Sequence, residues 1–229
     1  MKLFGVLLIA AVTAFADGPG KIVSKRAAED FPLSADPDAK QWKGIPGVFA
    51  ENDSFGKPLP GYRTEIRSRW TDKYLYFLYI QPYKTLYLID NPSTTTETNK
   101  LWEHDVAEVF ISADFDHIRQ YKELQVSPQS EWVDLEIDRE HPKPEGGWRW
   151  NSGYTVKARV DDKAKVWYGE MKIPLSSLDV TAPKTGQQMR VNFFRMQGPP
   201  SDQIGIAWQP TNNRSYHVPE AFGRLILGN

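Results

Sequence analysis

From Tyr62 onward the chain alternates apolar and polar residues with a period of two, which is the pattern of half-buried β-strands. Two of these runs, 62–70 and 74–81, are separated by three turn residues and predict a hairpin. Further short runs, bounded by Pro, Gly, Asp and Asn, cover residues 106–112, 121–127, 132–138, 154–160, 166–173, 189–196, 205–210 and 224–227. Only PLSSLD, residues 174–179, resembles a helical turn. This pattern predicts an all-β fold, specifically a single-domain antiparallel β-sandwich of the jelly-roll type.

The N-terminal part of the chain lacks this alternation. Residues 17–55 are rich in Pro, Gly, Asp and Ala, so we expect an irregular lead-in that packs on the domain, with one short strand near residues 45–50. The sandwich domain itself is expected to span residues 56–229.

The first residues have the pattern of a processing signal. A short positive start at Lys2 precedes the apolar run 3–12 and the A-x-A sequence 14–16. This pattern predicts a signal peptide, residues 1–16, that is cleaved after Ala16, and therefore a protein exported to a periplasm or outside the cell. No later stretch approaches the roughly 20 consecutive apolar residues of a membrane helix, so no membrane anchor is expected.

Composition narrows the possible partners. The 229 residues carry 28 Lys and Arg against 29 Asp and Glu, a formal net charge of −1, which gives no electrostatic reason to bind nucleic acid. The absence of cysteine excludes disulfides, a thiol nucleophile and Cys-ligated metals, and it suggests a bacterial source. The 8 Trp, 10 Tyr and 11 Phe suit β-structure and flat binding surfaces alike.

The run 106–112 separates two kinds of side chain. Its alternation places Ala107, Val109 and Ile111 on one face and Glu108 on the other. If the run 121–127 is the neighbouring strand, the outer face of the pair carries Glu108, Glu123, Gln125 and Ser127, next to Trp102. Such a row could form the floor of a site for a hydroxyl-rich ligand. The wet face of any antiparallel sheet alternates in the same way, so both interpretations stay open.

A second candidate segment lies near the C-terminus. Asn212 and Asn213 precede Tyr216 and His217, so one loop offers amide groups and an aromatic plane. Sugars have apolar C–H faces as well as hydroxyls, and their sites pair aromatic rings with amide and carboxylate partners. The alternative is that Asn-Asn is turn chemistry and Tyr216 a loop anchor.

Several of these segments together resemble a known family. In chain order they are LWEHDVAEVFI, YKELQVSP, WYGEMKIPLSSL, MRVNFFR and YHVPEAFGRLIL. The ordered set resembles carbohydrate-binding module family 9 and its standalone relatives in bacterial exported proteins, from about Tyr62 to Leu227. The resemblance implies a β-sandwich that binds mono-, oligo- or polysaccharides without catalysis, in polysaccharide breakdown beside a partner glycoside hydrolase.

Individual residues match the family pattern to different degrees. Trp102 matches the first of two rings that clamp the sugar, and Glu108 matches the acid that follows it. Tyr216, which follows Asn212 and Asn213, falls near the second ring. The resemblance departs at Gln125 and Ser127, where the sugar-binding pattern has an arginine and an asparagine. It also implies a structural calcium, for which Asp114 and Asp116 are candidates, although two acids in a turn are commonly just a turn.

Three other functions remain as alternatives. A glycosidase would need two carboxylates flanking a cleft, and the sequence singles out no such pair, no G-x-S-x-G elbow and no metal-ligand spacing among its four histidines. A haem-binding relative of the same architecture would draw its ligands from Met171, Met189, Met196, His104 and His217. A structural or interaction domain with a decayed sugar site is the third.

Overall fold

The computed structural model describes residues 20–144 and 148–229, and this part of the chain is all-β. It contains no α-helix, and its only helical elements are short 3-10 turns. No helix among these residues is long and apolar enough to cross a membrane. The predicted signal peptide, residues 1–16, lies outside the described residues.

The strands are β1 (Lys21–Arg26), β2 (Gly47–Ala50), β3 (Thr64–Trp70), β4 (Tyr74–Pro82), β5 (Val106–Ser112), β6 (Gln120–Val126), β7 (Trp132–Asp138), β8 (Thr155–Asp161), β9 (Val166–Pro174), β10 (Gln188–Gln197), β11 (Ile204–Ala207) and β12 (Gly223–Leu227). The 3-10 helices are η1 (Leu101–Glu103), η2 (Leu175–Leu178), η3 (Pro200–Asp202) and η4 (Pro219–Ala221).

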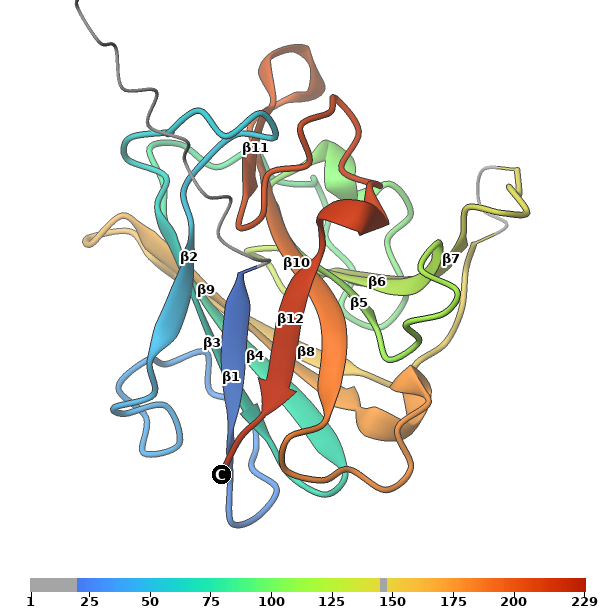
Figure 1. Ribbon diagram of the computed structural model, residues 1–229. Helices are drawn as coiled ribbons and strands as arrows, with labels where there is room; N and C mark the ends of the chain where they lie inside the picture. Colours follow the sequence, from blue (N-terminus) through green and yellow to red (C-terminus); the bar gives the residue numbers. More distant parts are fainter. Residues whose placement is uncertain (1–19, 145–147) are drawn as a thin grey trace, which may run out of the picture.

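All the strands belong to one continuous sheet, in the order β7-β6-β5-β10-β12-β1-β3-β4-β9-β8, with β11 on β10 and β2 on β3. Strand β1 joins two arms of this sheet, which are β7-β6-β5-β10-β12 on one side and β3-β4-β9-β8 on the other. Lys21–Ser24 pair with β12, and Lys25–Arg26 pair with β3. Both of these pairings are parallel, whereas the other ladders are antiparallel. Figure 1 shows β1 and β12 side by side in the centre of the molecule.

The all-β prediction is confirmed, and the predicted runs from 62 to 227 correspond to β3–β12, with the PLSSLD turn at η2. Two separate sheets are not observed, because β1 carries the hydrogen-bonded ladder from one arm to the other and the sheet nearly closes into a barrel. In the lead-in, β2 lies where one short strand was expected, and β1 is an additional strand.

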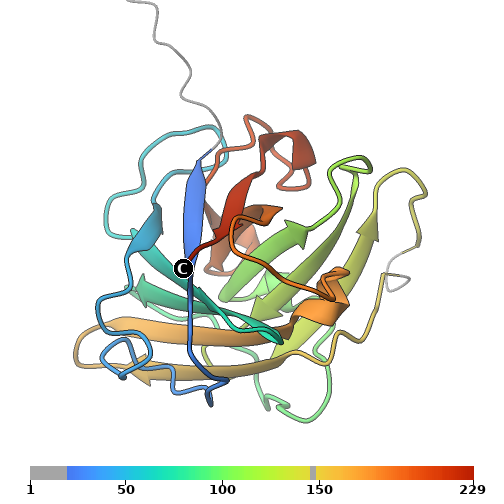
Figure 2. The same ribbon diagram turned by 60° about the horizontal axis from the view of Figure 1, so that its bottom comes forward.

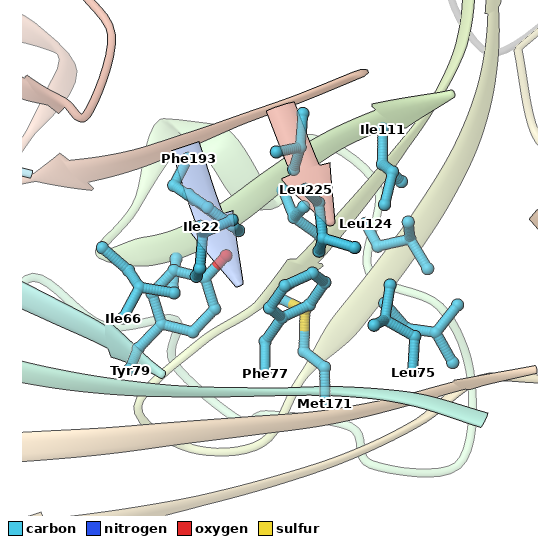
Figure 3. Close-up of a cluster of buried hydrophobic side chains, with 14 of the residues drawn as sticks. Ile22, Ile66, Leu75, Phe77, Tyr79, Ile111, Leu124, Met171, Phe193 and Leu225 are labelled. Atoms are coloured by element: carbon cyan, nitrogen blue, oxygen red, sulfur yellow. The ribbon is translucent and has the colours of Figure 1, made fainter. Parts of the chain in front are cut away.

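The two arms of the sheet face each other across the main core (Figure 2). Leu75, Phe77 and Met171 point from β4 and β9 toward Phe193 and Leu225 of the other arm (Figure 3). The rings of Phe77 and Phe193 meet edge to face, with centroids 5.1 Å apart. This geometry adds to the stabilisation that these rings gain from burial.

Side chains, rather than a ladder, connect the two ends of the sheet. The Tyr154 hydroxyl, just before β8, donates to the backbone oxygens of Gln125 (2.6 Å) and Val133 (3.0 Å). The Ala158 N–H of β8 donates to Ser130 Oγ in the β6–β7 turn at 2.8 Å. The edge strands β7 and β8 are therefore held together without forming a β-pair in the described chain.

The lead-in after β1 packs against the outer side of β4 and β9. Phe31 and Trp42 pack with Tyr76 in a small separate cluster. At its centre the buried Glu170 carboxylate accepts the N–H groups of Ser34 (2.6 Å) and Ala35 (2.6 Å) and the indole N–H of Trp42 (2.7 Å). An otherwise irregular segment is thus fixed by one acceptor on a strand.

Candidate functional site

A cavity of about 380 Å³ lies on the outer face of β5, β6 and β7. Its volume is in the range of small-molecule sites. Loops before β5, before β8 and after β11 form its walls. It is lined by Asn99, Trp102, Glu108, Phe110, Glu123, Leu135, Ile137, Arg139, Trp148, Met196, Gln203, Tyr216 and His217.

Strands β5 and β6 supply the floor. Their register pairs Glu108 with Gln125 and Phe110 with Glu123, so the two acids are diagonal neighbours on one face. The opposite face enters the main core, as the alternation predicted, with Ala107, Val109, Ile111, Leu124 and Val126 buried there.

The outer face of β5 and β6 is not an open wet surface. Glu108 is 3% exposed and Glu123 is 4% exposed, because aromatic residues from other segments form a second apolar cluster over this face. The cluster includes Phe110, Phe194 and Phe222, with Trp102, Trp148 and Tyr216 packed against it. Both carboxyls are thereby placed in an apolar, aromatic surrounding.

Trp102 lies in η1, directly before β5, and its position depends on Asp105. This fully buried carboxylate accepts the Gly198 N–H and a Gln197 amide N–H, both at 2.6 Å, at the end of β10. Gln203 Nε2 donates to the Trp102 carbonyl oxygen at 2.8 Å. The loop that carries the partly buried Trp102 indole is therefore fixed from two sides.

The opposite wall is formed by Tyr216 and His217. The Tyr216 ring meets Phe194 edge to face at 5.1 Å, and its hydroxyl lies over Gly205 of β11, where any Cβ would be 1.6 Å from the hydroxyl oxygen. The His217 ring stacks on Phe110, with centroids 5.1 Å apart, and its Nδ1 is 2.7 Å from the Tyr121 hydroxyl. Burial lowers the pKa of His217 to about 4, so the imidazole is neutral at ordinary pH.

Burial dominates the electrostatics of the two floor acids. It raises the pKa of Glu123 to about 7, against the opposing effect of the Gln125 amide, which donates to Glu123 Oε1 at 2.5 Å. It also raises the pKa of Glu108 well above its usual range, and the nearby charge of Glu123 raises it further. The other oxygen of Glu123, Oε2, is buried and has no hydrogen-bond partner within the described chain.

The predicted site residues fall into two groups. Trp102, Glu108 and Tyr216 all line the cavity. Gln125 lies on the same face, directly opposite Glu108, but it is fully buried outside the cavity lining, with its amide turned to Glu123. Ser127 lies away from the cavity, where its hydroxyl contacts Glu131 and accepts two N–H groups of the β6–β7 turn.

Asn212 and Asn213 are exposed and also lie outside the cavity lining. Asn212 has a positive φ of 52° and donates its N–H to the Ser54 oxygen at 2.7 Å, while Asn213 Oδ1 accepts the Ser215 N–H at 2.9 Å. Their contacts are those of turn chemistry, which was the alternative interpretation of this segment.

Several lining residues were not selected from the sequence. Trp148 and Gln203 lie in irregular segments without a periodic pattern, and Arg139 directly follows a strand. Glu123 was placed on the correct face but was not singled out, because alternation alone does not show which acids on a face are buried.

Of the two calcium candidates, Asp114 makes the hydrogen bonds of a turn. Both oxygens of Asp114 are engaged within its own turn, by the N–H groups of Asp116 (2.7 Å) and His117 (3.0 Å) and by His117 Nδ1 (2.8 Å). Calcium requires six to eight oxygen ligands. Among the described residues the acids and histidines close enough to share an ion are instead Asp138, Glu140 and His141, and this group does not include Asp114 or Asp116.

The residues considered for haem occupy three places in the described chain. Met171 and Met189 are fully buried in the main core, whereas Met196 and His217 line the cavity. The ring of His104 stacks on Tyr87, with centroids 4.9 Å apart.

Comparison with known proteins assigns the chain to a family. Residues 41–229 match the family model described as "Carbohydrate family 9 binding domain-like". The chain belongs to this family. Family 9 domains bind carbohydrates and are not catalytic, so this protein is a carbohydrate-binding module rather than a glycosidase. An "Extracellular protein" of Arthroderma benhamiae is 26% identical over 183 residues, which cover 75% of this chain and 80% of the relative.

Solved structures share the fold of this family 9 module at low sequence identity. The module of Caldicellulosiruptor kristjanssonii in complex with cellotriose has a TM-score of 0.65 at 15% identity, covering 92% of this chain and 94% of its own. The same organism's module in complex with glucose gives 0.65 at 16% identity, with 92% and 97% covered. A protein of Bacteroides uniformis gives 0.69 at 13% identity, with 90% and 98% covered.

Proposed function

We propose that the cavity on β5, β6 and β7 is the carbohydrate site of this protein and that it takes one terminal sugar residue between Trp102 and Tyr216. The observation that carries this proposal is that one cavity brings together aromatic walls from three separate segments of the chain and a carboxyl floor. Aromatic planes match the C–H faces of a sugar, and carboxyls match its hydroxyls. The family 9 neighbours that are complexed with glucose and cellotriose make glucose-based sugars the first ligands to test.

Each wall would contribute in a defined way. The Trp102 indole, held by Asp105 and Gln203, offers a preorganised plane, so little entropy is lost when a sugar stacks on it. The Glu108 side chain lines the cavity floor and can exchange hydrogen bonds with the hydroxyls. Gln203 and Asn99 add amide groups at the rim.

Calorimetric titration with glucose and cellotriose tests this site. Trp102→Ala should lower the affinity at least about 30-fold, since aromatic stacking and burial are worth roughly 2 kcal/mol or more. The matched control is Trp150→Ala, because the Trp150 ring lies under the Lys122 ammonium, outside the cavity lining. Equal affinity of the Trp102 variant and the wild type would rule out this cavity as the site.

We also propose that the protein acts outside the cell, after cleavage of residues 1–16, beside a glycoside hydrolase that degrades the bound polysaccharide. The Lys2 start, the apolar run 3–12 and the A-x-A sequence support export, as does the similarity to an extracellular relative. The intact mass of the protein recovered from the medium or periplasm should correspond to a chain that starts at Asp17. A secreted chain that retains Met1 would contradict the cleavage.

A further inference from the structure

The floor of the cavity holds two buried acids that form no ion pair with any residue of the described chain. Glu108 and Glu123 are 3% and 4% exposed, and the charged group that most affects the pKa of Glu108 is the other acid, Glu123. Their side chains are diagonal neighbours on adjacent strands, which places them within reach of one another. Burying carboxylates without a cation is costly, so two such groups in one apolar pocket require an explanation.

The surrounding groups do not supply a positive charge at this depth. His217 on the adjoining wall is neutral because burial lowers its pKa to about 4. The phenols of Tyr216 and Tyr121 stay protonated, since burial raises the pKa of each. From behind the strand, the Tyr79 hydroxyl donates to the Glu108 carbonyl oxygen at 3.0 Å. Arg139 lines the cavity but is exposed and forms no ion pair with a described residue.

The floor atoms that lack a hydrogen-bond partner in the described chain are carboxyl oxygens, which can accept hydrogen bonds. Glu123 Oε2 is buried without a partner in the described chain, and the Glu108 carboxyl makes no side-chain hydrogen bond to a described residue. Aromatic rings surround these acceptors. Carboxylates inside a group of aromatic rings are the arrangement that recognises an organic ammonium ion, through charge pairing and cation–π attraction.

We propose that this site prefers an amino sugar, with the ammonium group held between the carboxyls of Glu108 and Glu123. This inference rests on the proposed function and narrows its ligand from sugars in general to hexosamines with a free amine. One ammonium would offset one carboxylate, while the second carboxyl keeps its proton and serves as both donor and acceptor for a neighbouring hydroxyl. An N-acetylated sugar has no such charge and should lose the preference.

The pH dependence distinguishes this ligand from a neutral sugar. An ammonium needs an ionised carboxyl, so its affinity should rise as the pair loses a proton and fall again above pH about 8, where a sugar amine, like an α-amino group, is deprotonated. A neutral sugar bound by a protonated pair should instead bind best at low pH and lose affinity steadily as the pH rises. The first profile is bell-shaped and the second falls in one direction.

Titration calorimetry with D-glucosamine, D-glucose and N-acetyl-D-glucosamine tests the proposal. At pH 7.0 we expect glucosamine to bind at least about tenfold more tightly than the other two sugars. Its binding should also release a proton, which is measured by comparing the binding enthalpy in buffers of different ionisation enthalpy. Glu123→Gln keeps the shape and the acceptor for Gln125 but removes one charge, so the glucosamine-to-glucose ratio should fall below about threefold. The matched control is Glu136→Gln on β7, whose carboxylate contacts Lys122 outside the cavity and which should keep the ratio.

The failures of this inference and of the proposed function are separable. Glucose binding as tightly as glucosamine, with a loss of affinity toward high pH, would overturn the amino-sugar preference and leave the sugar site in place. A glucosamine preference that Glu123→Gln does not change would also overturn it, because the amine would then lie elsewhere. No binding of these monosaccharides or of cellotriose would overturn the proposed function itself.

Discussion

At the scale of single residues, the cavity shows how apolar covering changes the chemistry of an ordinary strand. Glu108 and Glu123 occupy positions that would be solvated on an open sheet, and both become buried because Phe194, Phe222 and Trp148 arrive from segments distant in sequence. A carboxyl in such a surrounding favours its neutral form. The pair therefore influences the stability of the protein as well as its affinity for a ligand.

The first prediction concerns stability against pH. The folded pKa of Glu123, about 7, is above its ordinary 4.5, so its contribution to stability is fully present below pH 4.5 and is lost as the pH rises through 7. Glu123→Gln has no such titration. We expect the melting temperature of the variant, relative to wild type, to increase by at least about 2–4 °C between pH 5 and pH 8, the shift that about 1 kcal/mol produces in a chain of this size. A constant difference across that range in thermal melts would contradict the assignment.

A second prediction at this scale uses Gly205. A Cβ at this position would lie 1.6 Å from the Tyr216 hydroxyl oxygen, and the side chain able to give way is Tyr216 itself. Gly205→Ala should therefore displace one wall of the cavity and lower sugar affinity by roughly tenfold. Tyr216→Phe removes the hydroxyl, and combining it with Gly205→Ala should recover part of the affinity because the clash becomes smaller. If calorimetry gives the same affinity for Gly205→Ala and wild type, Tyr216 does not contact the ligand.

What the sequence could predict at this scale follows from periodicity. Alternation correctly placed Glu108 opposite Ala107, Val109 and Ile111, because side chains of a strand alternate whatever covers them. It could not show that the face of Glu108 is buried, since that depends on which loops fold over it. Ser127 and Asn213 have the polar groups expected of a ligand site but use them within their own turns, and composition does not distinguish the two uses.

At the scale of elements, the long lead-in is held by a few specific contacts rather than by regular structure. Glu170 on β9 accepts three N–H groups from the segment 34–42, and Trp42 is fully buried beside it. Hydrogen bonds to a buried carboxylate are stronger than neutral ones. One strand residue thus determines how the irregular segment lies on the sheet.

We predict that Glu170→Ala will destabilise the protein by about 3 kcal/mol, because three N–H donors lose a charged acceptor. Two of these donors, the Ala35 N–H and the Trp42 indole N–H, belong to buried residues. This loss corresponds to a fall of roughly 6–12 °C in the melting temperature. Glu220→Gln is the control, since the exposed Glu220 only approaches Arg119 at 3.6 Å and should have almost no effect. A fall in melting temperature for Glu170→Ala as small as that of the control would show that other contacts hold the segment 34–42.

Strand β1 explains why the elements before residue 56 were the least predictable. Its sequence, KIVSKR, contains three charged residues in six, and only Ile22 and Ser24 are buried. Its partners β12 and β3 are distant in sequence and parallel to it, so no hairpin signal marks it. Most later strands form hairpins with sequence neighbours, namely β3–β4, β5–β6, β6–β7, β8–β9 and β10–β11, and their turn residues make those boundaries visible.

At the scale of the whole molecule, β1 turns two arms of strands into one sheet. It pairs with β12 through Lys21–Ser24 and with β3 through Lys25–Arg26, and the Ser24 and Ser68 hydroxyls meet behind it at 2.8 Å. The C-terminal segment also contacts the β1–β3 pair, since the indole N–H of Trp70, which pairs with Arg26, donates to the Gly228 oxygen at 2.7 Å. The family match begins at residue 41, yet these earlier residues complete the ladder on which the cavity strands depend.

The last prediction compares two truncations of the chain. Removal of residues 1–19 takes away no described residue, whereas removal of residues 1–26 also deletes β1, exposes the edges of β12 and β3, and uncovers Ile66 and Leu225 of the core. We expect the shorter truncation to melt as the intact mature protein does, and the longer one to lose at least about 10 °C in melting temperature or to fail to fold, given about 2–4 °C for each kcal/mol. Sugar affinity should fall with the longer truncation, because β5 reaches β1 only through β10 and β12. Equal melting temperatures and equal affinities for the two would mean that the arms fold and bind independently of β1, and that the region from residue 41 onward is sufficient.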